Sequence, residues 1–76
     1  MTNYKIIMKV GKRFKTATFT DSWLSNFAYD SMVAELVKRT KTTEFCGEIP
    51  QITLANVDTE TIIKDCIITD GTIFEQ

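Results

Sequence analysis

The chain has 76 residues, of which 43% are hydrophobic and 25% are charged, and its formal net charge is −1. This length suits a single domain over residues 1–76 and excludes a second hydrophobic core. The composition is that of an ordinary globular protein and excludes collagen-like and low-complexity chains. No apolar run approaches the roughly 18 residues of a membrane-spanning helix, so we expect no contact with a membrane.

The charge is unevenly distributed along the chain. Residues 1–15 contain five basic side chains and no acidic one. From residue 41 onward, two lysines stand against seven acidic residues, which gives that part a net charge of −5. The sequence therefore predicts a basic surface near the N-terminus and an acidic surface in the second half.

Residues 4–20 have the pattern of a β-hairpin. Apolar and polar side chains alternate over residues 4–10, which is the period of a strand with one buried face. Gly11 favours a tight connection, and residues 14–20 are rich in the aromatic and β-branched residues of a returning strand. Phe14 falls on the face opposite Ala17 and Phe19, so we expect a β-bulge near the turn to reconcile them.

Residues 23–40 contain no glycine or proline and are predicted to form a helix. Thr20, Asp21 and Ser22 are all suitable N-caps for it. An apolar stripe at spacings of three and four is expected to pack on the sheet, and its members are Tyr29, Met32, Val33, Leu36 and Val37. Asp30 projects into the flank of this stripe, so either the helix breaks near Asp30 or that flank is exposed.

The second half of the chain is predicted to form three more strands, over residues 52–57, 61–68 and 72–75. Between the last two, Asp70 and Gly71 are the pair that a type I′ hairpin turn prefers. The element order ββαβββ predicts an α+β domain with two layers. These are an antiparallel sheet and one helix packed on one of its faces.

Two features on which many enzymes depend are missing from the sequence. The chain has no histidine, and its three glycines are isolated, so it lacks a phosphate-binding loop. Cys46 and Cys66 lack the spacing of zinc ligands or of a redox pair, and we interpret them as structural thiols. Residues 1–5 lead directly into the alternating pattern rather than into an apolar signal-peptide core, which predicts a reducing, cytoplasmic location. We expect no enzymatic activity and no cofactor.

Several carboxylates raise the question of a metal site. Asp58 and Glu60, with Asp65 or Asp70, offer oxygen ligands of the kind that a hard cation prefers. The spaced oxygens and the glycine of a calcium-binding loop are absent. We therefore interpret these residues as part of a solvated turn and predict no bound metal.

The N-terminal hairpin is the first candidate binding surface, and its basic residues are Lys5, Lys9, Lys12, Arg13 and Lys15. They would engage an acidic protein surface, or they would bind nucleic acid with Tyr4 and Phe14 stacked on bases. The ordinary alternative is a solvated sheet face whose lysines protect an edge strand from aggregation. The acidic second half favours that alternative over nucleic acid, because it repels a phosphate backbone.

Two further surfaces are candidates. The acidic residues of the second half would occupy a basic groove on a target protein, and they are Glu44, Glu48, Asp58, Glu60, Asp65 and Asp70. Trp23, Leu24 and Phe27 form an aromatic flank at the start of the helix, of the kind that dominates binding hot spots. The alternative for Trp23 and Phe27 is that they cover the end of the core.

Without catalytic residues, the chain is predicted to act by binding another protein. The leading hypothesis is a small inhibitor or regulator of a larger protein or complex, and small phage-encoded inhibitors resemble it in size and character only. A nucleic-acid-binding domain that uses the basic hairpin is the first alternative. A structural homo-oligomer, such as a homodimer, is the second, because a domain of this size is only marginally stable alone.

Overall fold

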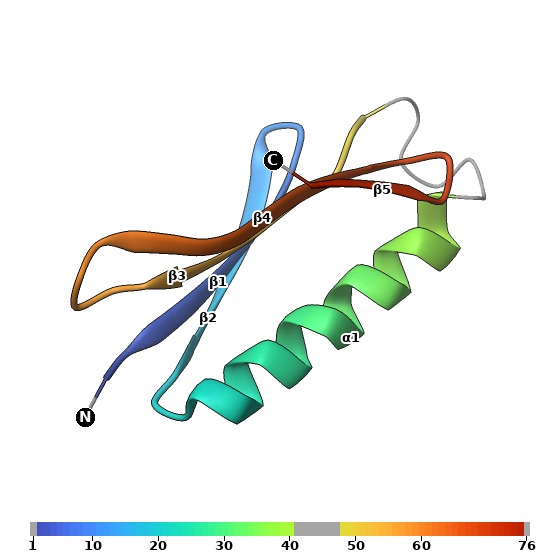
Figure 1. Ribbon diagram of the computed structural model, residues 1–76. Coiled ribbons are helices and arrows are strands. Elements are labelled where there is room, and N and C mark those ends of the chain that lie inside the picture. The colour runs from blue at the N-terminus through green and yellow to red at the C-terminus, as the bar shows by residue number, and fades with distance from the viewer. Residues whose placement is uncertain (1, 41–47, 76) are drawn as a thin grey trace.

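The computed structural model describes residues 2–40 and 48–75, which form one five-stranded antiparallel sheet and one helix. The elements are β1 (Tyr4–Val10), β2 (Arg13–Phe19), α1 (Ser22–Thr40), β3 (Gln51–Asn56), β4 (Thr61–Thr69) and β5 (Thr72–Glu75). The strands lie side by side in the order β2-β1-β3-β4-β5, and α1 runs diagonally across one face of the sheet (Figure 1). The predicted α+β class and the predicted element order are confirmed.

The β1–β2 hairpin forms without the predicted β-bulge. Its register is unbroken from the pair Tyr4–Phe19 to the pair Val10–Arg13, and Gly11 in the turn has a φ of 60°. A glycine at the first central position with positive φ is what a type II′ turn requires. The prediction of a bulge was therefore wrong, and Phe14 lies on the face opposite Phe19. The register shift in this sheet lies elsewhere, between β3 and β4 after Leu54.

The helix is continuous through Asp30. The backbone N–H of Leu24 donates to Oδ1 of Asp21 at 3.1 Å, so Asp21 is the N-cap that closes the first turn. The carboxylate of Asp30 is exposed and lies 3.7 Å from the ammonium group of Lys64 on β4. Of the two alternatives that the sequence left open, the exposed flank is correct.

The hydrophobic core lies between α1 and the sheet. It consists of Ile6, Tyr29, Val33, Leu36, Ile52, Leu54, Cys66 and Ile68, and Met32 and Val37 pack against it. Every second residue of β1 and β3 points into this layer, and for β1 this is the alternation that the sequence predicted. Over the described part of the chain, the helix does not combine the length and the apolar character that crossing a bilayer requires.

The end of the helix is tied to the last hairpin. Asp70 and Gly71 have φ angles of 50° and 76°, so the predicted type I′ turn between β4 and β5 is formed. The N–H of Gly71 donates to Oγ1 of Thr40 at 2.8 Å. This contact ties the β4–β5 turn to the end of α1.

Candidate binding surfaces

A groove of about 570 Å³ lies beside α1 and is lined by residues of α1, β4 and β5. Tyr29 and Cys66 are among its lining residues, and the Tyr29 hydroxyl donates to Sγ of Cys66 at 3.2 Å. Burial raises the pKa of the Cys66 thiol above its ordinary value and raises the pKa of the Tyr29 phenol as well. Both groups are therefore neutral near pH 7, and the groove presents no thiolate nucleophile.

The acidic residues of the second half do not converge on one surface. Asp58 and Glu60 lie in the β3–β4 turn, where Asp58 accepts hydrogen bonds from Asn3 at 2.9 and 3.2 Å. Asp70 lies in the turn at the opposite end of β4. The remaining described members are Glu48, whose carboxylate closely approaches Gly11 in the hairpin turn, and Asp65, in the middle of β4.

Glu44 lies outside the described residues. Among residues 2–40 and 48–75, no three potential ligands from histidine, cysteine, aspartate and glutamate gather as a metal site would need. An acidic surface that imitates a phosphate backbone would require the carboxylates to follow one line or one face. The dispersion of the described carboxylates weighs against that version of the binding hypothesis.

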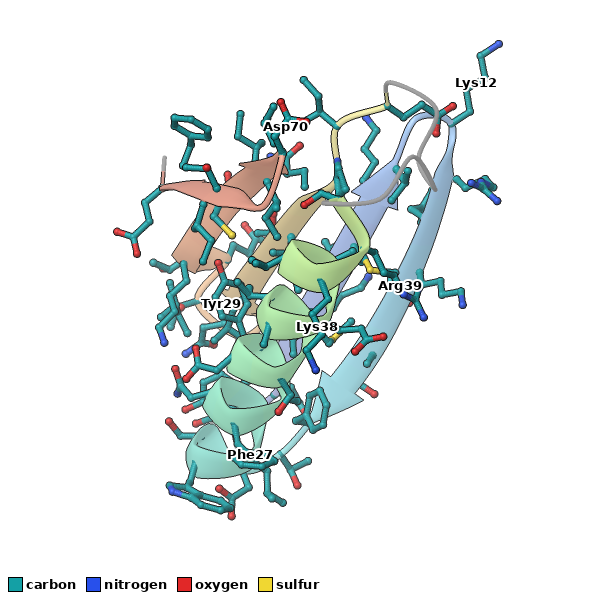
Figure 2. All side chains as sticks on the ribbon, turned by 90° about the vertical axis from the view of Figure 1, so that its right-hand side faces the viewer. Lys12, Phe27, Tyr29, Lys38, Arg39 and Asp70 are labelled. Atoms are coloured by element: carbon teal, nitrogen blue, oxygen red, sulfur yellow. The ribbon has the colours of Figure 1, made fainter. Side chains whose placement is uncertain are left out.

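The basic residues of the hairpin are divided between the two faces of the sheet. Lys5 and Lys9 lie on the face turned away from α1, and Lys12 lies at the tip of the β1–β2 turn (Figure 2). Arg13 and Lys15 share the helix side of the sheet, because they pair with residues that point toward α1. Tyr4 also lies on the helix side, where it packs against the core, so it is not available to stack on a base beside Lys5 and Lys9.

Within the described residues, no element covers the face of the sheet turned away from α1, which we call the open face (Figure 1). One row of side chains crosses the open face through all five strands, because each member is paired with the next. This open-face row consists of Phe14, Lys9, Gln51, Ile67 and Phe74. The two phenylalanines at its ends are 69% and 50% exposed.

Phe74 was missed in the sequence analysis. A two-residue Asp70-Gly71 turn places Ile67 directly opposite Phe74, and the parity of β4 then assigns both to the open face. The Asp70-Gly71 pair was therefore the sequence feature from which the position of Phe74 on the open face could have been predicted.

The aromatic flank at the start of α1 is exposed. Trp23, Leu24 and Phe27 are 69%, 48% and 59% exposed, so the alternative in which Trp23 and Phe27 cover the end of the core is wrong. The rings of Trp23 and Phe27 stack with centroids 5.5 Å apart and an interplanar angle of 14°. In the view onto the helix, Phe27 lies near the start of α1, far from Lys12 (Figure 2). We call Trp23, Leu24 and Phe27 the helix-start cluster.

The exposure of the helix-start cluster follows from helix geometry. Side chains two residues apart on an α-helix are rotated by about 200°, so Phe27 points away from the side that carries Ser25 and Tyr29. Ser25 is fully buried against the sheet, and its hydroxyl donates to the carbonyl of Ser22 at 2.8 Å. The sheet side of the first two turns is thus occupied, and the aromatic side chains have no place in the core.

The two aromatic surfaces differ in charge. Residues 22–29 contain no charged side chain, whereas the open-face row contains Lys9 and has Lys5 on the same face. The cations of the last turn of the helix, Lys38 and Arg39, lie at its other end.

Comparison of the chain with protein-family models, with curated proteins and with solved structures found no match.

Proposed function

We propose that this chain is a non-catalytic protein-binding module, acting as a small regulator or inhibitor of a larger protein. The observation that carries the proposal is the helix-start cluster, in which two stacked aromatic rings and a leucine remain largely exposed. Tryptophan and other aromatic side chains are enriched among the few residues that supply most of the energy of a protein interface.

The helix-start cluster is organised before binding. The stacking of Trp23 on Phe27 fixes two side chains that have few rotatable bonds, so little conformational entropy is lost when a partner covers them. The helix beneath them is held by the Asp21 cap and by the buried Ser25. A partner therefore contacts an apolar cluster whose side chains and supporting helix are already ordered before binding.

The surroundings of the cluster indicate the character of the partner. The cluster itself is uncharged, and the polar side chains of Asp21 and Asn26 lie beside it in sequence. An apolar centre with a polar margin is the arrangement of a protein interface, in which the margin excludes water from the centre. We infer that the partner offers an apolar pocket about the size of one or two aromatic rings.

The groove beside α1 supports a binding function rather than a catalytic one. Its thiol and its phenol are both held in the neutral form by burial, and the chain contains no histidine to act as a base. The carboxylate of Asp30 at its rim is paired with Lys64. These groups supply no activated nucleophile.

The proposal is tested by capture of partners from a lysate of the native host, followed by mass spectrometry. The bait is the intact chain, the double variant Trp23→Ala/Phe27→Ala, or the control double variant Phe14→Ala/Phe74→Ala. The control removes two exposed aromatic rings from the open face instead. We expect a partner that the wild type and the control retain and that the Trp23→Ala/Phe27→Ala variant loses.

Two outcomes would contradict the proposal. One is capture of the same proteins in the same amounts by all three baits. The other is self-association through the cluster, seen as a dimer of the wild type and a monomer of the Trp23→Ala/Phe27→Ala variant in sedimentation at several concentrations. The second result would make the chain a homo-oligomer instead.

A further inference from the structure

We propose that the open face of the sheet is a second binding surface, and that its ligand is single-stranded nucleic acid. The proposal rests on the open-face row, which places a basic side chain, an amide and two exposed aromatic rings in one line across five strands. It is independent of the helix-start cluster, which lies on the other layer of the domain.

The two phenylalanines of the open-face row are far enough apart to contact separate bases. Neighbouring strands in a sheet are 4.7–4.9 Å apart, so Phe14 and Phe74, four strand spacings from each other, lie roughly 19 Å apart. Sheets that bind single-stranded RNA stack two or three bases on aromatic side chains of their exposed face. Phe14 and Phe74 are too far apart for neighbouring bases, so each ring is suited to stack a separate base of a longer bound segment.

Charge on the open face complements a phosphate backbone. Lys9 is paired directly with Phe14, and Lys5 follows two residues earlier on the same strand and the same face. Lys12 adds a third cation at the tip of the adjacent turn. A cation beside an aromatic ring is the combination that binds a backbone and a base of one nucleotide together.

Among the residues of the five strands, Asp65 is the one acidic side chain that the pairing places on the open face. Asp65 accepts hydrogen bonds from Nε2 of Gln51 at 3.1 Å and from Oγ1 of Thr53 at 3.0 Å. Its negative charge opposes phosphate and weakens binding at this face. It therefore provides a variant, Asp65→Asn, that should bind more tightly.

The ligand is inferred to be single-stranded because of the aromatic rings. The face of a base is available for stacking only where the base is unpaired, whereas a duplex offers its phosphates and groove edges. Lys5 and Lys9 on the open face favour nucleic acid over protein there, whereas residues 22–29 at the helix-start cluster contain no cation.

The test is fluorescence anisotropy with labelled 12-nucleotide oligo(dT) and oligo(U), and with a 12-base-pair duplex, at 50 mM and 200 mM salt. Contacts from three lysines predict that log K falls with log salt with a slope of about −2. The affinity should therefore fall roughly 20-fold between the two salt concentrations. The single strands should bind more tightly than the duplex.

Matched variants separate the open face from general attraction to charge. We expect Phe14→Ala/Phe74→Ala to lower the affinity at least about tenfold, since each stacked base loses its ring. Lys9→Gln should lower both the affinity and the salt slope, and Asp65→Asn should raise the affinity roughly twofold. Trp23→Ala/Phe27→Ala and Lys38→Gln, which alter the helix layer, should leave the affinity unchanged. Equal urea midpoints of the variants show that they are folded.

Three results would overturn the proposal. They are an absence of binding at 50 mM salt, a duplex affinity equal to that of the single strands, and equal losses in the open-face and helix-layer variants. A host protein captured through Phe14 and Phe74 would also overturn it, because the open face would then bind protein. An absence of binding, or a duplex affinity equal to that of the single strands, leaves the proposal for the helix-start cluster intact, so the two proposals can fail separately.

Discussion

The two faces of the sheet are made by the same five strands, but their large side chains differ in what they contact. On the face under α1, Ile6, Ile52 and Leu54 are completely buried in the core. On the open face, Phe14 and Phe74 are at least half exposed. The helix shows the same division, with Leu36 inside and Phe27 outside. Burial explains the inner set, and the outer set needs another explanation, which we propose is binding.

The largest expected effect separates the two faces by stability. Leu54→Ala should lower the free energy of unfolding by about 2–5 kcal/mol, because it leaves a cavity in the core. Ile62→Ala removes a side chain of similar size from an exposed position on β4 and should cost less than about 1 kcal/mol. Urea unfolding followed by circular dichroism measures both. Similar losses would show that the open face also contributes to folding.

The second effect is a dependence of stability on pH that arises inside the core. The unfolded Cys66 thiol titrates near pH 9.0, and burial raises its pKa in the folded chain. The contribution of the neutral Cys66 thiol to the free energy of unfolding is fully present below pH 9.0. It is lost as the pH rises above 9.0, because the unfolded state then binds fewer protons than the folded state. The loss is up to about 1.4 kcal/mol per pH unit.

Cys66→Ala is the control for this pH effect. Between pH 8 and pH 10, urea unfolding should show a smaller decrease in stability for Cys66→Ala than for the wild type. Tyr29, whose pKa is also raised, begins to contribute only near pH 10 and contributes in both proteins. An equal decrease would mean that the thiol is not held in its neutral form.

The third effect concerns what holds the start of the helix. Asp21→Ala should lower the free energy of unfolding by about 1 kcal/mol, because the N–H of Leu24 loses its acceptor. Asp21→Asn keeps a capping oxygen and should be nearly neutral. Chemical denaturation of both variants checks this, and identical midpoints for Ala and Asn would argue against a capping role.

The smallest expected effect is that of the helix-start cluster on stability. Trp23→Ala/Phe27→Ala should change the free energy of unfolding by less than about 1 kcal/mol, since exposed pairs four residues apart on a helix contribute only tenths of a kcal/mol. Denaturation in urea, followed by circular dichroism, measures it. A loss as large as that of Leu54→Ala would mean that the cluster serves folding.

Local patterns in the sequence were enough to predict the fold. Alternation over residues 4–10, the Asp70-Gly71 turn and the uninterrupted helical segment each act within a few residues, and together they define the order ββαβββ. The sequence pattern did not define the register of β2 at Phe14, because that register depends on the pairing of β2 with β1. The shift after Leu54 depends in the same way on contacts between distant segments.

The sites were predicted less well than the fold. The sequence named Phe27 as part of an exposed flank but left open that it covers the end of the core, because only the structure shows that buried Ser25 occupies the sheet side. Composition grouped Lys5 with Arg13 as one basic surface, but strand pairing puts them on opposite faces. Charge along the chain does not define a surface until the register is known.

The most direct measurement of the central claim uses Trp23, the only tryptophan of the chain. Labelled with 5-fluorotryptophan, the protein gives a single ¹⁹F NMR resonance that reports on the helix-start cluster. We expect this resonance to shift and broaden when the captured host protein is added, and we expect the same of the Phe14→Ala/Phe74→Ala variant. A partner that binds while the resonance stays at its free position would contradict the account.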